Sequence, residues 1–277
     1  MDKNTINFKN HFPHILILIL ISLLISLSYT FLQYGLDGGL VLSNKVIYPD
    51  NNSPMMYYYF NSWTAIHQIS YIFIKFGMTV ESVSRIIILC STIFFSFGVF
   101  LFSNSITQNR NLSLIISIVA ILIGKNFGDT DYPSLIFSEH TYGMVSLSLV
   151  TFSFGLLANK NLLLASAISI FLIAIHPLIG LWMFFINLLG TFFIKMNKIE
   201  IFKGVAAGLF FLVLSFIFFY TNTIEKLSYD HNLFLNYLND WDGHRALTDV
   251  IHYDYLIKTF ILGILIFFFI KKKNILK

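Results

Sequence analysis

Long runs of apolar residues alternate with short polar segments along the whole chain. A helix needs roughly 20 mostly apolar residues to cross the hydrocarbon core of a bilayer. Eight segments have this character, at residues 13–33, 83–103, 111–125, 142–158, 161–176, 177–195, 203–220 and 256–271. The pattern predicts an all-α polytopic membrane protein with about eight transmembrane helices. We expect one transmembrane domain over residues 1–277.

Composition excludes an ordinary water-soluble domain. The chain is 56% hydrophobic and only 12% charged, with a mean hydropathy of +0.74, whereas soluble domains carry about 25% charged residues. The net charge of +4 does not indicate a nucleic-acid partner, because the lysines flank apolar runs and set membrane orientation there. The single cysteine, Cys90, excludes an internal disulfide and a cysteine-based zinc site. The first run lacks a small-x-small cleavage site, so we expect it to remain as an anchor.

Basic residues orient the chain, because positively charged short loops stay in the cytoplasm. Lys3 and Lys9 predict a cytoplasmic N-terminus. Counting through eight spans places the other basic clusters on the same side: Arg110, Lys160, Lys195, Lys198, Lys203 and Lys271–Lys273. The expected location is a plasma (inner) membrane, with both termini in the cytoplasm.

Three outer segments, residues 34–82, 126–141 and 221–255, then hold most of the acidic side chains. Twelve of the fourteen carboxylates lie in them: Asp37, Asp50, Glu81, Asp129, Asp131, Glu139, Glu225, Asp230, Asp240, Asp242, Asp249 and Asp254. Charge is costly in hydrocarbon. Acidic segments gathered on one side therefore indicate a site for a polar substrate or a divalent metal.

The second half of the first outer segment, about residues 56–76, mixes aromatic and aliphatic residues with polar ones. This pattern predicts a helix that lies in the membrane interface, with Tyr57–Tyr59 and Trp63 at headgroup depth. We expect His67 to be a satisfied interfacial residue. The alternative is a ninth spanning helix, which would invert everything downstream and place Lys271–Lys273 outside, against the positive-inside rule.

The second outer segment contains an Asp-x-Asp pair, Asp129 and Asp131. Two carboxylates at this spacing can hold a divalent ion, Mg or Mn, and share it with a phosphate. Alternatively, they are solvated or cap the next helix. Their proximity to Glu139 and His140, at the mouth of the fourth span, favours function. Asp129, Glu139 and His140 are therefore candidate catalytic residues, and Asp129 with Asp131 a candidate metal site.

The third outer segment is the most polar, and Asp242, His244 and Arg245 are its candidate substrate-binding residues. The Arg245 guanidinium can pair with diphosphate oxygens in a fixed fork. An ion pair with Asp242 or Asp249 is an equal alternative. Trp241 can stack on a sugar face or anchor at the interface.

A tight outer turn at His176-Pro177 joins the fifth and sixth predicted spans. Proline breaks the helix there because it lacks an N–H and clashes with the preceding turn. Histidine at such a turn can point at an outer cavity, so His176 is a further candidate substrate-binding residue.

The layout of these segments resembles the GT-C class of membrane glycosyltransferases. An inside N-terminus and one span precede a long outer segment, which opens with an aspartate and continues as an interfacial helix. Three stretches resemble bacterial polytopic proteins often grouped with that class: Tyr48–Asn52, Asp129–His140 and Ala174–Trp182. The likeness covers roughly residues 10–255, and Asp50 within it is a candidate substrate-binding residue.

The resemblance implies that Asp37 matches the first-loop acidic position, which acts as catalytic base or metal ligand in such enzymes. Here Asp37 is followed by two glycines, where many members have an acidic pair. The chain is also shorter than typical members and lacks the soluble C-terminal domain that some carry. A minimal form, a truncated product and a diverged relative are all consistent with that.

The implied activity uses a lipid-linked sugar as donor. A polyprenyl-phosphate sugar diffuses within the membrane, while a polar glycan or glycolipid acceptor approaches from outside. An outer carboxylate would take a proton from the acceptor hydroxyl. His244, Arg245 or a metal held by Asp129 and Asp131 would stabilise the departing phosphate. This chemistry belongs to cell-surface polysaccharide or glycoconjugate synthesis.

Three alternatives remain at this stage. A surface-polysaccharide polymerase or ligase also uses outward-facing lipid-linked sugars, and its expected arginine-rich outer loops are represented only by Arg245 and Arg85. A transporter or flippase would bury ionisable residues at mid-membrane and show inverted repeats, neither of which is apparent. A non-catalytic subunit of a larger assembly is the third alternative.

Overall fold

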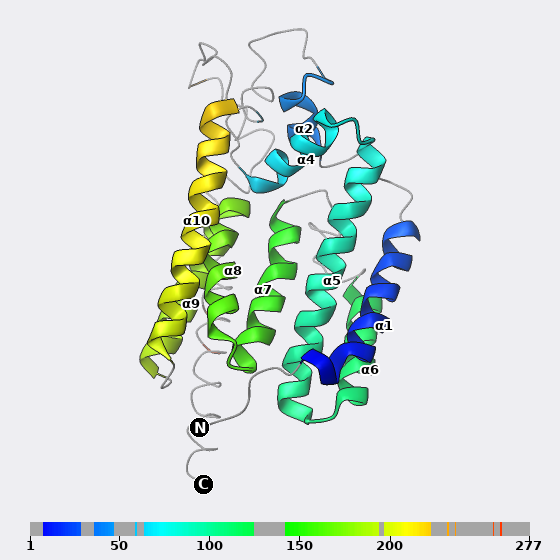
Figure 1. Cartoon of the computed structure of the whole chain (residues 1–277), viewed down its shortest axis with the longest axis vertical. Coiled ribbons are helices and arrows are strands. Elements are labelled where there is room, and N and C mark those ends of the chain that lie inside the picture. Colours follow the sequence, from blue (N-terminus) through cyan, green and yellow to red (C-terminus); the bar gives the residue numbers. More distant parts are fainter. Residues whose placement is uncertain are drawn as a thin grey trace. The chain divides into compact units, whose positions relative to one another are not determined.

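The computed structural model describes residues 8–28, 36–46, 59, 64–124, 142–193 and 197–222, together with residues 232, 236, 257 and 261. Every regular element in these residues is a helix (Figure 1). The chain divides into two compact units, Met1–Pro49 with Tyr58–Lys226 and Asp50–Tyr57 with Leu227–Lys277. All the helices described below belong to the first unit, and the prediction of one domain stays a prediction.

Among its described residues, this unit contains seven long helices and two short ones. The long ones are α1 (Phe8–Ser28), α5 (Val80–Thr107), α6 (Arg110–Gly124), α7 (Tyr142–Ala158), α8 (Leu162–Ile175), α9 (Pro177–Phe193) and α10 (Lys198–Asn222). The short ones are α2 (Asp37–Leu42) and α4 (Ala65–Lys75). Among the described residues, α1, α5 and α10 are long and apolar enough to cross a membrane, and four shorter helices are also apolar. The architecture is compatible with a helical membrane protein.

The helices coincide with seven of the eight segments predicted as spans, and the eighth, at 256–271, lies outside the described residues except for Ile257 and Ile261. The count of about eight spans stays a prediction. The starts of α1 and α10 differ most from the predicted ones: α1 begins at Phe8 and not at 13, so that it contains Pro13, and α10 begins at Lys198 and not at 203. Proline inside an apolar helix is tolerated where neighbouring groups satisfy the freed carbonyl, so it does not mark the start here.

Glycines set how closely the long helices approach. A Cβ added at Gly98 of α5 would lie 2.5 Å from the backbone nitrogen of Phe152 on α7. One added at Gly204 of α10 would lie 2.3 Å from the carbonyl oxygen of Leu163 on α8. Small residues at such crossings let backbones touch, which is how helices associate when lipid removes the hydrophobic drive between them. The pairs α5–α7 and α8–α10 are therefore held by backbone contact.

Non-helical backbone conformations end the short helix α4 on both sides. Thr64 before it is extended, and Gly77 after it has a φ of 90°, a conformation that glycine adopts without strain. Its 11 residues give a length of about 16 Å, against the roughly 30 Å of a hydrocarbon core. This helix is too short to span, which favours the interfacial interpretation over a ninth span.

Helices α2 and α4 lie together at one end of the unit, where α5 begins and α10 ends (Figure 1). We call this the α4 end. A buried apolar cluster joins them to the long helices: Leu36 beside α2, Ala65 and Ile74 of α4, and Leu172 and Ile175 of α8. The cluster fixes α2 and α4 on the bundle.

Candidate functional site

Asp37 is the first residue of α2, and its carboxylate is held by a tyrosine from a later part of the chain. The Tyr59 hydroxyl donates to Asp37 Oδ2 at 3.0 Å. Tyr59 is 8% exposed, and Asp37 is half-buried. A carboxylate can accept about four hydrogen bonds. Tyr59 therefore fixes the orientation of Asp37 without exhausting its capacity to accept a proton or a ligand.

The two glycines after Asp37 allow α2 to rest directly on α4. A Cβ at Gly38 would lie 2.4 Å from Cγ and Nδ1 of the His67 ring, and one at Gly39 would lie 2.6 Å from the Ser70 Cβ. Side chains at these positions would displace α2. Neither Gly38 nor Gly39 has room for a larger side chain such as a carboxylate.

His67 of α4 is buried, with 4% of its surface exposed. Burial removes water from the ring and lowers its pKa from 6.5 to about 4. The ring is therefore neutral at neutral pH, and it does not form an ion pair with Asp37. The side chain of His67 points into the protein, and the interfacial location of its helix stays a prediction.

Aromatic rings link His67 to two other parts of the chain. Its ring makes edge contacts with Tyr59, at 5.9 Å between centroids, and with Tyr142 of α7, at 6.0 Å. The Tyr142 ring lies 5.4 Å from that of His176. Such edge-to-face pairs stabilise by about 0.5–1.5 kcal/mol beyond area burial. We call Asp37, Tyr59, His67, Tyr142 and His176 the α2–α4 cluster.

His176 ends α8 and caps α9. Its backbone is extended, and Pro177 is the first residue of α9, as the sequence predicted. The backbone N–H of Ile179 donates to His176 Nδ1 at 3.4 Å, in the manner of an N-cap side chain. Nδ1 is then the acceptor, so the ring proton lies on Nε2. The role of His176 in the described structure is to shape this turn and contact Tyr142.

Hydrogen bonds between polar groups link α4 and its N-cap to the long helices α10 and α8. The Ser215 hydroxyl of α10 donates to Gln68 Oε1 at 2.7 Å, and the Thr64 hydroxyl donates to the carbonyl oxygen of Ile175 at 2.8 Å. All three side chains are buried. Buried polar groups require such partners because an unmade hydrogen bond costs about 1–3 kcal/mol. Specific hydrogen bonds therefore hold α4, the helix on which α2 and Asp37 rest.

Arg85, one of the two arginines weighed as support for a polymerase or ligase, is used within the fold. Its guanidinium pairs with Glu81 at 2.8 Å and donates to the carbonyl oxygens of Ser26 and Leu27 at 2.9 and 2.8 Å. These carbonyls end α1, where intrahelical donors run out. Arg85 therefore caps α1, and the arginine evidence for a polymerase or ligase is reduced to Arg245.

The structure describes two of the predicted site residues, Asp37 and His176, and connects them through Tyr59, His67 and Tyr142. The others lie outside the described residues: Asp50, Asp129, Asp131, Glu139, His140, Asp242, His244 and Arg245. The described part of the chain contains no group of three metal-ligating side chains. The predicted Mg or Mn site on Asp129 and Asp131 is not among these residues.

Sequence reasoning missed Tyr59 and His67 as site residues. Tyr59 is buried and donates a hydrogen bond to Asp37, and its location at headgroup depth stays a prediction. A signal was present: Thr64, His67, Gln68 and Tyr71 repeat at helical spacing and form one polar face. In an apolar chain, a polar face of this kind turns toward protein.

No protein-family model, no curated protein and no solved structure matches the chain.

Proposed function

We propose that the protein is a membrane glycosyltransferase that moves a sugar from a polyprenyl-phosphate donor to a glycan or glycolipid acceptor at the outer face of a bacterial inner membrane. Asp37 is its general base. The observation that carries this proposal is the setting of Asp37: a half-buried carboxylate, oriented by Tyr59, on a short helix that two glycines seat on α4. The GT-C resemblance supplies the reaction class.

This setting suits proton abstraction. A general base needs a fixed orientation and hydrogen-bond reach to the proton that it takes. In the proposed step, Asp37 accepts the proton of the acceptor hydroxyl. The acceptor oxygen bonds to the anomeric carbon of the sugar, and the bond from that carbon to the phosphate oxygen breaks. The electron pair leaves with the polyprenyl phosphate.

The neutral state of His67 supports this role. A protonated histidine beside Gly38 would add a positive charge near Asp37, which favours the carboxylate form and weakens it as a base. Burial holds the pKa of His67 at about 4, so the ring acts as an uncharged support for Gly38. Asp50, Asp242, His244 and Arg245 remain predicted substrate contacts. Asp129, Glu139 and His140 remain predicted catalytic residues outside the described part of the chain.

The test uses the purified chain in lipid nanodiscs with radiolabelled polyprenyl-phosphate hexoses and a total cell-surface glycan extract as acceptor. The readout is release of polyprenyl phosphate and transfer of label. We expect Asp37→Asn to lower turnover by roughly 10²–10⁴-fold, the usual contribution of a positioned base. Glu81→Gln is the matched control, because it removes a carboxylate that only pairs with Arg85. It should change turnover less than about twofold.

The competing transport function gives a different result. A flippase would move labelled donor across sealed vesicles that contain no acceptor. Movement of this kind, unchanged by Asp37→Asn and without label in the glycan, would overturn the proposed transfer reaction.

A further inference from the structure

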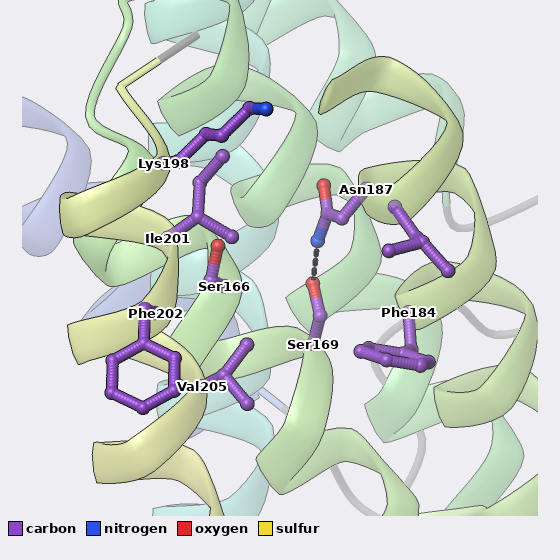
Figure 2. A pocket seen from close by; sticks show the side chains of 9 residues that line it. Ser166, Ser169, Phe184, Asn187, Lys198, Ile201, Phe202 and Val205 are labelled. Carbon is purple, nitrogen blue, oxygen red and sulfur yellow. Dashed lines mark hydrogen bonds between the residues drawn. The ribbon is translucent and has the colours of Figure 1, made fainter. Parts of the chain in front are cut away.

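A cavity of about 280 Å³ lies between α8, α9 and α10 (Figure 2). Its lining includes Ser166 and Ser169 of α8, Asn187 of α9, and Lys198 and Val205 of α10. Lys198 begins α10, whereas the contact with α4 is made by Ser215. At about 1.5 Å per residue, these two positions are some 25 Å apart. The cavity is therefore separate from the α2–α4 cluster.

Asn187 presents a buried acceptor to this cavity. Its side chain is 7% exposed, and its Nδ2 donates to the Ser169 hydroxyl. Ser169 in turn donates to the carbonyl oxygen of Ala165 at 2.7 Å. Since the serine proton is used there, its oxygen must accept, which fixes the amide with nitrogen toward Ser169. Asn187 Oδ1 is then left without a hydrogen-bond partner.

Figure 2 shows Asn187 Oδ1 turned away from Ser169, toward the end of the cavity where the Lys198 side chain lies. An unpaired acceptor in an apolar setting is costly. A ligand with a hydroxyl or N–H donor would satisfy it. Lys198 offers a cation to the same ligand.

The cavity opens onto a surface suited to lipid. Phe202, at its rim, is 74% exposed, and Leu188 is 39% exposed. α10 is long and apolar enough to span, and only 17% of its apolar window is buried. Lys198 stands at the first turn of this helix, and a basic residue at the end of an apolar helix attracts anionic lipid headgroups. An amphipathic ligand can reach the cavity from the bilayer.

We propose that this cavity binds a membrane phospholipid with an anionic, hydroxyl-bearing headgroup, of the phosphatidylglycerol type. The phosphate pairs with Lys198, a glycerol hydroxyl donates to Asn187 Oδ1, and the start of an acyl chain lies along Ile201 and Val205. A phosphate diester without hydroxyls has no proton to give Asn187. The volume is near the lower limit of ligand cavities, roughly 300 Å³, so it holds part of a lipid. This site is independent of the proposed transfer reaction.

The test measures lipid binding to the purified full chain by native mass spectrometry. Phosphatidylglycerol is compared with phosphatidylmethanol, which has the same charge and no hydroxyl, and with phosphatidylcholine and phosphatidylethanolamine. We expect phosphatidylglycerol to bind at least about fivefold more tightly than phosphatidylmethanol, the effect of one hydrogen bond. Phosphatidylcholine, which has no donor and adds a cation beside Lys198, should bind more weakly still. Phosphatidylethanolamine can donate an N–H to Asn187 but also adds a cation beside Lys198, so it should bind more weakly than phosphatidylglycerol. Soluble glycerol phosphate should not compete.

Variants of the lining separate the two contacts. Asn187→Leu should reduce phosphatidylglycerol binding to the phosphatidylmethanol level, and Lys198→Met should weaken both anionic lipids. Lys203→Met is the matched control, because Lys203 is exposed on the same helix and does not line the cavity. It should leave both affinities unchanged.

A second test fills the cavity and leaves Asn187 in place, so it does not depend on correct folding of the Asn187→Leu variant. Val205→Trp should abolish the lipid preference, whereas Val213→Trp, at a 52% exposed position of the same helix, should retain it. Equal binding of the four lipids to the wild type would overturn the proposal. A preference that survives Val205→Trp would also overturn it.

Discussion

Helix α4 buries polar side chains beside apolar ones, whereas α10 exposes large apolar side chains. α4 turns His67, Gln68 and Ser70 inward, while α10 leaves Phe202 and Phe210 exposed at 74% and 60%. In a bilayer, lipid is as apolar as any core, so apolar side chains gain little by facing protein. Close packing and polar pairs then hold helices together. The buried polar face of α4 therefore holds this helix in one specific position, and α4 in turn supports the helix that carries Asp37.

The sharpest way to break this arrangement is to fill the space between α2 and α4. Gly38→Ala places a methyl group 2.4 Å from the His67 ring. We expect a loss of about 3 kcal/mol in unfolding free energy, at the upper end for overpacking, and loss of transfer activity. Thermal unfolding in detergent and donor turnover measure the two effects.

A second substitution shows whether the clash is the cause. His67→Ala removes the ring that the new methyl group meets, so the double variant should recover much of the stability that Gly38→Ala loses on its own. Additive losses in the double variant would refute direct packing of α2 on this ring.

The buried histidine predicts a defined acid sensitivity. The pKa of His67 is about 4 in the folded protein and 6.5 when exposed, so the unfolded chain binds the proton more readily between these values. Stability should be unaffected by this group above pH 6.5, fall as pH drops toward 4, and level off below. The total is about 3 kcal/mol. Chemical unfolding between pH 6.5 and 4 should show a free energy of unfolding that depends less on pH in His67→Phe than in the wild type. An equal dependence on pH in both proteins would mean that His67 is not buried in its neutral form.

The pair between α4 and α10 predicts a smaller effect. Ser215→Ala leaves Gln68 Oε1 without the 2.7 Å hydrogen bond that it now accepts. Gln68 is buried, so we expect a loss of about 1–2 kcal/mol. Ser105→Ala is a suitable control, because that serine bonds only to its own helix. Equal effects of the two variants on thermal unfolding would argue against a specific link between the helices.

The exposed face of α10 predicts the smallest effect. Phe210→Leu changes a side chain that is 60% exposed, and it should alter unfolding by less than about 0.5 kcal/mol. The same measurement in detergent checks it. A loss above 2 kcal/mol would show that this face packs against protein, and the contrast with α4 would fail.

Local chemistry was predictable from the sequence, and long-range pairing was not. The break at His176-Pro177 follows from proline alone, and the apolar runs gave the helices within a few residues, except that Pro13 falls inside α1. The bond between Tyr59 and Asp37 joins residues 22 apart. No periodicity in the sequence encodes this pairing. The packing of Gly38 against His67 and of Gly39 against Ser70 is a long-range contact of the same kind.

The central claim is that the Asp37 carboxylate takes the acceptor proton, and chemical rescue tests it most directly. The measurement is sugar transfer by Asp37→Ala in nanodiscs, with and without added sodium formate, using sodium chloride at equal ionic strength as control. We predict a loss of roughly 10²–10⁴-fold that formate partly restores and chloride does not. Full transfer by Asp37→Ala without formate would contradict the account.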